Sequence, residues 1–313
     1  MNTLSIALAL VHVATALCMP FLLVGCINRT KSWWSGRKGP GLWQTLHDMR
    51  RLLSKPQVYS TTTTPVFRLG ATMVLASVAM AMACVPLLGA YAPLSFPHDF
   101  VAVAYTLGLG RLMLMVSALD TGSAFEGMGT AREAMYGVFA EAALFMLLGT
   151  AAAASGMGSF ADMLGRLHAT PYYGWVAVPM VLALMVLMQV EAARMPVDDP
   201  ATHLELTMIH EVMVLDHSGP DLAAMQYACA LKLTLYCGLI AALLNPFDPL
   251  RQPVGAVTTA LALMVAIAVV QGSLESLMAR LPLPGVARYI WLAGWMAAAA
   301  AIAVGSVGGG LRI

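Results

Sequence analysis

Apolar residues occur in eight long runs, and each run is long enough to cross a membrane as a helix. They lie at residues 3–27, 67–91, 99–119, 134–156, 173–194, 222–244, 254–279 and 286–307. A transmembrane helix needs about 20 mostly apolar residues, and continuous runs of this length exclude the alternating pattern of barrel strands. The pattern therefore predicts an all-α integral membrane protein with about eight transmembrane helices, forming one polytopic domain over residues 1–313.

The composition supports placement in a lipid bilayer. Of the 313 residues, 59% are hydrophobic and only 11% are charged, whereas a soluble domain carries roughly 25% charged residues. So few charges cannot cover a water-facing surface. The net charge of +1 says nothing about nucleic acid, and no basic stripe or zinc-finger spacing supports it, so we expect no nucleic-acid partner.

The basic residues indicate how the chain is oriented. With eight spans, loops 28–66, 120–133, 195–221 and 280–288 lie on one side of the membrane, and this side carries most of the loop Lys and Arg. Cytoplasmic loops hold an excess of these residues. We therefore expect these four loops in the cytoplasm and both termini on the opposite side (N-out and C-out).

The first of these loops contains a helix-like pattern of its own. In residues 41–55, Leu42, Leu46, Met49 and Leu53 recur every three or four positions. This spacing predicts an amphipathic helix lying in the membrane surface. Two roles remain open for it: an anchor, or a platform for a soluble partner.

Several charged residues lie inside the apolar runs. Arg111, Glu141 and Lys232 are well inside the third, fourth and sixth runs, and Glu191 and Glu275 are near the cytoplasmic ends of the fifth and seventh. A charge at the bilayer centre costs at least about 2.5 kcal/mol, so such residues face the bundle interior and need partners. They either fix the packing or form a proton relay.

We favour the relay for Glu141 and Lys232, since intramembrane ionisable groups usually mark such pathways. For Arg111 and Glu275 we expect structural charge pairing. An arginine scarcely deprotonates, and Glu275 can reach interfacial water.

The densest charge follows the fifth run, in the stretch EAARMPVDDPATHLELTMIHE at residues 191–211. Pro196 and Pro200 bracket Asp198 and Asp199, which predicts a turn. Glu205 follows Thr202 by three residues, so it is either the acid of a capping box or a partly buried carboxylate. The apolar residues around Glu211 also indicate partial burial, where a carboxylate titrates nearer neutral pH. The full set of relay candidates is Glu141, Glu191, Arg194, Asp198, Asp199, Glu205, Glu211 and Lys232.

No metal or cofactor site is expected within this chain. His203, His210 and His217 recur every seven residues, which separates them by about 10.5 Å along one helix, too far to share an ion. The five cysteines form no C-x-x-C pair, so an iron–sulfur or zinc site is also not expected.

The same acidic stretch resembles a known family. Its pattern E-x-x-R-x-P-x-D-x-P, followed by an E-L pair and a final S-G, is similar to the core membrane subunit shared by respiratory complex I and membrane-bound [NiFe] hydrogenases, the NuoH-like family. The form PVDDPATHLELTMIHEVMVLDHSGPDL, residues 196–222, is closer to the hydrogenase branch, of the formate hydrogenlyase and hydrogenase-4 type. The eight spans and the basic first loop with GPGLWQ at residues 39–44 extend the likeness over most of the chain.

This resemblance implies a subunit that is not catalytic on its own. Such a subunit anchors a soluble redox arm and links it to proton-translocating, antiporter-like membrane subunits in a bacterial or archaeal cytoplasmic (inner) membrane. Its implied partners are the hydrogenase large and small subunits and iron–sulfur subunits, which would hold the NiFe centre and the clusters. By motif match, Glu191, Arg194, Asp198 and Glu205 occupy family positions, and Glu141 does so by its placement.

Other functions remain open. One alternative is a complex I–type subunit that lines a quinone site; Asp199, which stands where complex I members usually have leucine, argues against it. An apolar tunnel between the first span, the 41–55 helix and loop 195–221 would favour it. An independent transporter is a further alternative, although the sequence has no strong internal repeat. The last is purely structural anchoring.

Overall fold

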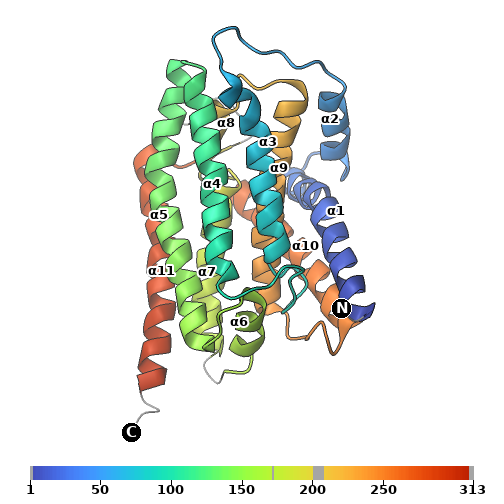
Figure 1. The fold of residues 1–313 in the computed structure, drawn as a ribbon, viewed down its shortest axis with the longest axis vertical. Coiled ribbons are helices and arrows are strands. Elements are labelled where there is room, and N and C mark those ends of the chain that lie inside the picture. The colour runs from blue at the N-terminus through green and yellow to red at the C-terminus, as the bar shows by residue number, and fades with distance from the viewer. Residues whose placement is uncertain (1–2, 171–172, 200–207, 310–313) are drawn as a thin grey trace.

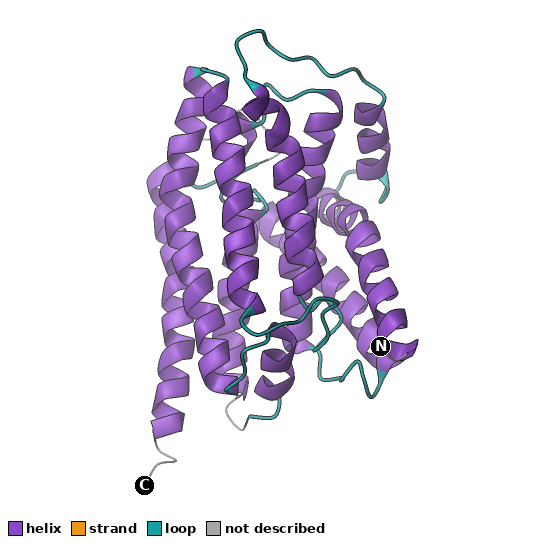
Figure 2. Ribbon diagram, in the orientation of Figure 1, coloured by secondary structure: helices purple, strands orange, loops and turns teal. Residues whose placement is uncertain are grey.

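The computed structural model describes residues 3–170, 173–199 and 208–309, and within these ranges all regular structure is helical (Figures 1 and 2). Eight helices are long and apolar enough to cross a membrane, which confirms the predicted fold class and number of spans. They are α1 (Thr3–Trp34), α3 (Pro65–Cys84), α4 (Asp99–Asp120), α5 (Ala124–Ser155), α7 (Tyr173–Glu191), α9 (Gly219–Leu244), α10 (Pro253–Leu277) and α11 (Leu283–Gly309).

Three short helices complete the part of the chain that the structure describes. The amphipathic helix expected at residues 41–55 is present as α2 (Gln44–Leu53), whose Met49 is buried while Leu46 and Leu53 are exposed. Helix α8 (His210–Met213) begins at the end of the charged stretch 191–211, and α6 (Phe160–Leu167) joins α5 to α7. Helix α6 was not predicted from the sequence, because its residues lie between two apolar runs.

The ends of two spans differ from the predicted limits. Helix α3 ends at Cys84, although the apolar run continues to residue 91. Pro86 cannot donate to the helix and pushes Val85 into an extended conformation, which the structure shows with ψ 131°. Leu87 and Leu88 are buried all the same, so apolar character here reflects core packing of a non-helical segment.

Helix α5 begins at Ala124, ten residues before the predicted start of its span. The predicted loop 120–133 is therefore wrong for most of its length, because only residues 121–123 connect α4 to α5. The additional turns carry Glu126 and Glu133. Both acids thus belong to the same helix as Glu141, at spacings of seven and eight residues, which place them on one face.

Helix α9 forms the centre of the bundle. It packs against α1, α2, α3, α7 and α10, and 83% of its most apolar window is buried, compared with 22% for α11. Around it, α3 pairs with α4, α1 with α10, and α11 with α5 and α7. Figure 1 shows α1 beginning and α11 ending at the same end of the bundle, as an even number of spans requires.

A tight turn ends α7 and returns the chain toward the bundle. The N–H of Arg194 donates to Gln189 O at 2.9 Å and the N–H of Ala193 to Val190 O at 3.4 Å, the bonding pattern of a Schellman cap. Ala193 adopts the left-handed conformation (φ 48°) that glycine usually supplies in such a cap. The turn buries Arg194 beside α10 instead of leaving it in the loop.

Candidate functional site

The intramembrane charges gather around Arg111 on α4. Its guanidinium contacts Glu141 on α5 (Nη1 to Oε1, 2.6 Å), Glu133 on α5 (Nε to Oε1, 3.2 Å) and Glu191 on α7 through Nη2. Lys232 on α9 lies 3.4 Å from the other oxygen of Glu191. We call these five residues, which belong to four membrane-spanning helices, the Arg111 cluster.

The packing leaves room for this cluster where α4 and α5 approach each other. A Cβ atom at Gly137 would lie 2.7 Å from Arg111 Nη1, and one at Gly108 would lie 3.3 Å from Glu141 Oε1. Glycine at these two positions lets the charged groups lie between the helices. Four of the predicted residues, Arg111, Glu141, Glu191 and Lys232, are thereby brought together.

Glu133, the fifth member of the cluster, was not predicted from the sequence. It stands in the segment that was expected to be a loop, directly before the predicted start of the fourth span. The available signal was its spacing of eight residues from Glu141, which places two acids on one face if the helix extends that far.

A second cluster joins the end of α7 to α10 and α1. Arg194 makes a two-pronged contact with Glu275 (Nε to Oε1, 2.7 Å; Nη2 to Oε2, 3.2 Å), and Lys31 reaches the same carboxylate at 3.1 Å. The Glu275 side chain is wholly buried. Gln271 donates to Glu275 at 3.1 Å and accepts from Gln189 at 2.9 Å. The expected pairing role of Glu275 matches this geometry, whereas the two glutamines were not predicted.

Asp198 fixes the turn that follows. Its Oδ2 accepts the backbone N–H groups of Ile209, His210 and Glu211 at 3.2, 2.8 and 3.4 Å, and its Oδ1 accepts Arg280 Nη2 at 2.5 Å. The carboxylate therefore caps α8 from eleven residues upstream. The predicted turn is present at residues 195–197, directly before Asp198, where the N–H groups of Val197 and Asp198 donate to Arg194 O at 3.0 and 3.2 Å. Pro200 and Glu205 lie outside the described residues.

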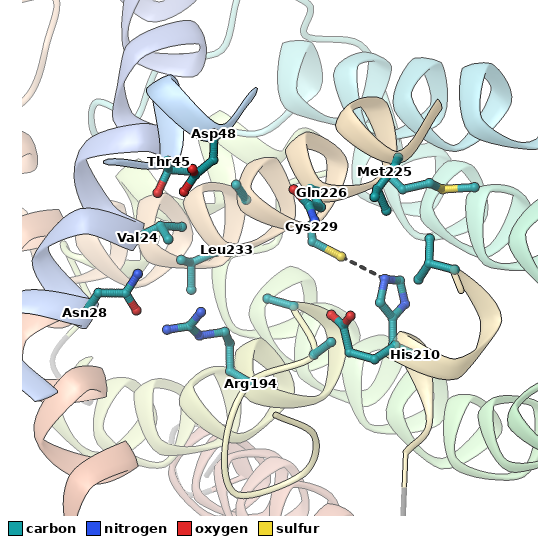
Figure 3. A pocket seen from close by; sticks show the side chains of 16 residues that line it. Val24, Asn28, Thr45, Asp48, Arg194, His210, Met225, Gln226, Cys229 and Leu233 are labelled. Carbon is teal, nitrogen blue, oxygen red and sulfur yellow. Dashed lines mark hydrogen bonds between the residues drawn. The ribbon is translucent and has the colours of Figure 1, made fainter. Parts of the chain in front are cut away.

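A cavity of about 320 Å³ opens between α1, α2, α8, α9 and the turn at residues 192–194 that ends α7. Figure 3 shows side chains from separate elements on its wall, among them Asn28 of α1, Asp48 of α2, Arg194 and His210. Cys229 Sγ lies 3.0 Å from His210 Nε2. Apolar residues such as Val24 and Leu233 complete a lining that is mixed in character.

Two residues of α8 on the cavity wall have shifted pKa values. Burial, reinforced by the charges of Asp198 and Asp199, raises the pKa of Glu211 to about 7. Burial lowers the pKa of His210 to about 3, so this imidazole is neutral at physiological pH. Glu211 is thus the group on this wall that can exchange a proton near neutral pH.

The three histidines do not act together in the described structure. His210 faces the cavity, whereas His217 stacks on Phe67 of α3 with ring centroids 4.2 Å apart. His203 lies outside the described residues. Within residues 3–170, 173–199 and 208–309, no group of three or more His, Cys, Asp or Glu side chains is arranged to hold a metal ion.

The sequence also matches known proteins. The NADH dehydrogenase family matches the chain over residues 6–305. Hydrogenase-4 component C of Escherichia coli (strain K12) is 28% identical over 248 residues, which cover 78% of this chain and 76% of the relative. Formate hydrogenlyase subunit 4 of the same strain is 27% identical over 297 residues, covering 92% and 95%.

A solved structure shares the fold. A chain of the membrane-bound sulfane sulfur reductase, an archaeal respiratory membrane complex, superposes with a TM-score of 0.81. The match covers 96% of this chain and 99% of the other, at 17% sequence identity. The likeness therefore extends over the whole bundle, not a few of its helices.

Proposed function

This chain belongs to the NADH dehydrogenase family, and from that premise we propose that it is the membrane subunit of a multisubunit [NiFe] hydrogenase. In this role it anchors the soluble redox arm and links it to proton-translocating, antiporter-like subunits in the cytoplasmic membrane. Its relatives, a hydrogenase-4 component and a formate hydrogenlyase subunit, support the assignment to the hydrogenase branch. The NiFe centre and the iron–sulfur clusters would reside in the partners.

The Arg111 cluster is the observation that carries the proposed coupling role. Three carboxylates and two cations lie in contact between four membrane-spanning helices, where unpaired charge is costly. Purely structural pairing needs one acid for each base. The larger set leaves a carboxylate that can gain or lose a proton while Arg111 stays charged.

The exposure of Glu141 supports a second membrane subunit beside α4 and α5. Its side chain is 41% exposed in the isolated chain, although it lies near the middle of a spanning helix. Lipid would not solvate that carboxylate. A polar surface from an antiporter-like neighbour would cover it and would extend the relay beyond this chain.

The first test identifies the complex. The tagged chain is purified from its host membrane in mild detergent, and the proteins and metals that accompany it are determined. We expect nickel, iron, hydrogenase subunits and antiporter-like subunits. Recovery of a flavin-linked dehydrogenase arm without nickel, or of the folded chain alone, would contradict the hydrogenase assignment.

The second test addresses the relay itself. Glu141→Gln keeps the shape of the side chain and removes its proton-binding group. In inverted vesicles that hold the assembled complex, we expect hydrogenase-driven proton translocation to fall at least tenfold, which corresponds to about 1.4 kcal/mol. Asp162→Asn, on the exposed surface of α6, is the matched control and should translocate normally. Unchanged translocation by Glu141→Gln in an intact complex would exclude this glutamate from the relay.

The cavity favours one second candidate, a subunit that lines a quinone site. The cavity opens between α1, α2 and α8, where such a site was expected, and ligand pockets begin at about 300 Å³. Its wall is not purely apolar, however, because Arg194, His210 and Glu211 contribute to it. We therefore expect the purified complex to show no hydrogen-dependent reduction of a short-chain ubiquinone. Quinone reduction that Leu233→Trp abolishes by filling the cavity would favour the second candidate.

A further inference from the structure

A long apolar groove lies on the membrane-facing surface between α7, α10 and α11, away from the Arg111 cluster. Its volume is about 620 Å³, and its floor is formed by Ile240 of α9 and Ile267 of α10. Ile240 and Ile267 on the floor are 1% and 7% exposed, whereas Leu182, Val270 and Leu292 on the rim are 50%, 51% and 42% exposed. The groove exists because α10 packs on α1 and α9 while α11 packs on α5 and α7, as the separation of α10 from α11 in Figure 1 illustrates.

The side chains that line the groove suit an acyl chain better than a neighbouring helix. Helix–helix contacts within membranes are rich in small residues, which let the backbones approach each other. This protein follows that rule where α11 joins the bundle, because Ala293, Ala297 and Ala300 are fully buried there. The groove, by contrast, is lined by Leu, Ile, Val and Met apart from Gln189 and Tyr289 at one end, and Ala266 is the one small residue among its lining residues.

The polar end of the groove is closed. Tyr289 donates to Gln189 at 2.5 Å, and Gln189 donates to Gln271 at 2.9 Å. These bonds separate the groove from Glu275 and Arg194 behind them. An occupant therefore contacts hydrocarbon side chains along most of its length and meets the amide and phenol groups only at one end.

A basic residue lies at that end. Arg288 is exposed, forms no ion pair with a described residue, and precedes Leu292 of the groove rim by four positions. Positions four apart lie on the same helix face, so Arg288 stands one turn beyond the rim toward the loop end of α11. Basic side chains between transmembrane helices at this level attract anionic lipid head groups.

We propose that this groove binds an anionic glycerophospholipid, with one acyl chain between α7, α10 and α11 and the phosphate at Arg288. The bound chain completes the apolar surface over the Tyr289–Gln189–Gln271 bonds and keeps water away from these bonds on the groove side. The inference goes beyond the proposed function and does not depend on which redox arm the subunit carries.

Native mass spectrometry of the purified complex tests the site. The complex is delipidated and returned to nanodiscs that contain phosphatidylglycerol and phosphatidylcholine. We expect wild type to retain phosphatidylglycerol preferentially. Arg288→Ala should lower that retention about fivefold, as one basic residue near a head group predicts. Arg251→Ala, which removes an exposed arginine from the loop before α10, is the matched control and should behave as wild type.

Two groove variants separate binding in the groove from simple attraction to charge. Ala266→Trp fills the groove, and Val270→Trp narrows its exposed rim without touching the floor, so the second remains informative if the first fails to fold. Both should lose the retained lipid while Arg288 is unchanged. The proposal would be overturned if Arg288→Ala and Val270→Trp retained as much phosphatidylglycerol as wild type. A cross-link from Leu182→Cys to a helix of a neighbouring subunit would also overturn it.

Discussion

At the scale of single residues, Glu275 belongs to a buried ion pair, and we expect this pair to contribute more to stability than an ion pair on the surface. Its wholly buried carboxylate holds Arg194 and Lys31. Glu275→Gln would leave the Arg194 guanidinium buried without its counter-charge, and breaking such a pair costs about 3–5 kcal/mol. We expect a clearly lower thermal midpoint for the purified complex, followed by intrinsic fluorescence.

An exposed pair in the same chain serves as the control. Asp248 and Arg251 form an ion pair at 3.5 Å with side chains 46% and 87% exposed, and such pairs contribute only about 0–1 kcal/mol. Asp248→Asn should therefore melt close to wild type. Adding Arg194→Met to Glu275→Gln should recover part of the loss, because the stranded charge is removed. Equal midpoints for Glu275→Gln and Asp248→Asn would contradict the buried-pair argument.

Glu211 should make stability depend on pH. Its pKa is about 7 in the folded chain against an ordinary value of 4.5, so the folded state binds more protons than the unfolded state between these values. The free energy of unfolding therefore falls as the pH rises from about 4.5 through about 7. We expect Glu211→Gln to remove this fall, measured as thermal midpoints from about pH 5 to about pH 8.

The neighbouring His210 acts in the opposite direction. Its pKa of about 3 lies below the ordinary 6.5, so its contribution to stability rises as the pH rises from about 3 through 6.5. The informative quantity is therefore the difference in thermal midpoint between wild type and Glu211→Gln at each pH. A difference that does not change with pH would show that Glu211 titrates normally.

The sequence identified charged members of the site better than neutral ones. Arg111, Glu191 and Lys232 interrupt apolar runs, and the cost of charge in lipid makes every such interruption informative. Gln189, Gln271 and Tyr289 carry no charge, so nothing in the sequence separates them from ordinary polar residues. Their hydrogen bonds appear only once α7, α10 and α11 are placed in space.

At the scale of elements, close contact between α5 and α8 depends on Gly129. A Cβ atom there would lie 2.1 Å from Val212 Cγ1 and 3.0 Å from Ile209 O. Gly129→Ala should therefore shift α8 and lower the free energy of unfolding by about 1–3 kcal/mol, the usual cost of overpacking. Thermal melting and the rate of Cys229 alkylation, followed by mass spectrometry, measure the two effects.

The same helix offers a matched control two residues away. A Cβ atom at Gly127 would meet nothing within 4 Å. Because alanine favours a helix over glycine by about 1 kcal/mol, Gly127→Ala should melt at or above the wild-type temperature. If both substitutions had the same effect, helix propensity and not the contact with α8 would be the cause.

Local chemistry accounts for the limits of α3, although the prediction placed them at residues 67 and 91. Thr64 caps α3 and Pro65 begins it, and Pro86 accounts for its early end. The start of α5 was not predictable in this way. Its first turns contain charged and small residues that resemble a loop, yet Gly129 and Thr130 are buried against other helices. Tertiary packing, not local propensity, sets that boundary.

At the scale of the whole molecule, orientation in the membrane remains a prediction from the basic residues. We expect Ser60→Cys, in the first basic loop, to react with a membrane-impermeant maleimide only after the membrane is permeabilised. Gln252→Cys, in the loop at the opposite end of the bundle, should react in intact cells. Both residues are exposed. The reverse pattern would show that the chain is inserted the other way.

The number of spans was predictable, whereas the helices that each span packs against were not. Run length alone counts transmembrane helices, because the thickness of the bilayer sets the length that each needs. Helices α7, α9 and α10 are apolar on all sides, so the sequence does not distinguish a lipid-facing side from a buried one. That α9 occupies the centre follows only from the packing.

The Arg111 cluster has a consequence that follows from counting its charges. With every group ionised, Glu133, Glu141 and Glu191 oppose Arg111 and Lys232, which leaves one unbalanced negative charge. One added proton makes the set electrically neutral, and a second would make it a net cation. In the proposed coupling role, the cluster would therefore alternate between two charge states that differ by one proton, and a neighbouring subunit would experience that difference as a change in the local electric field.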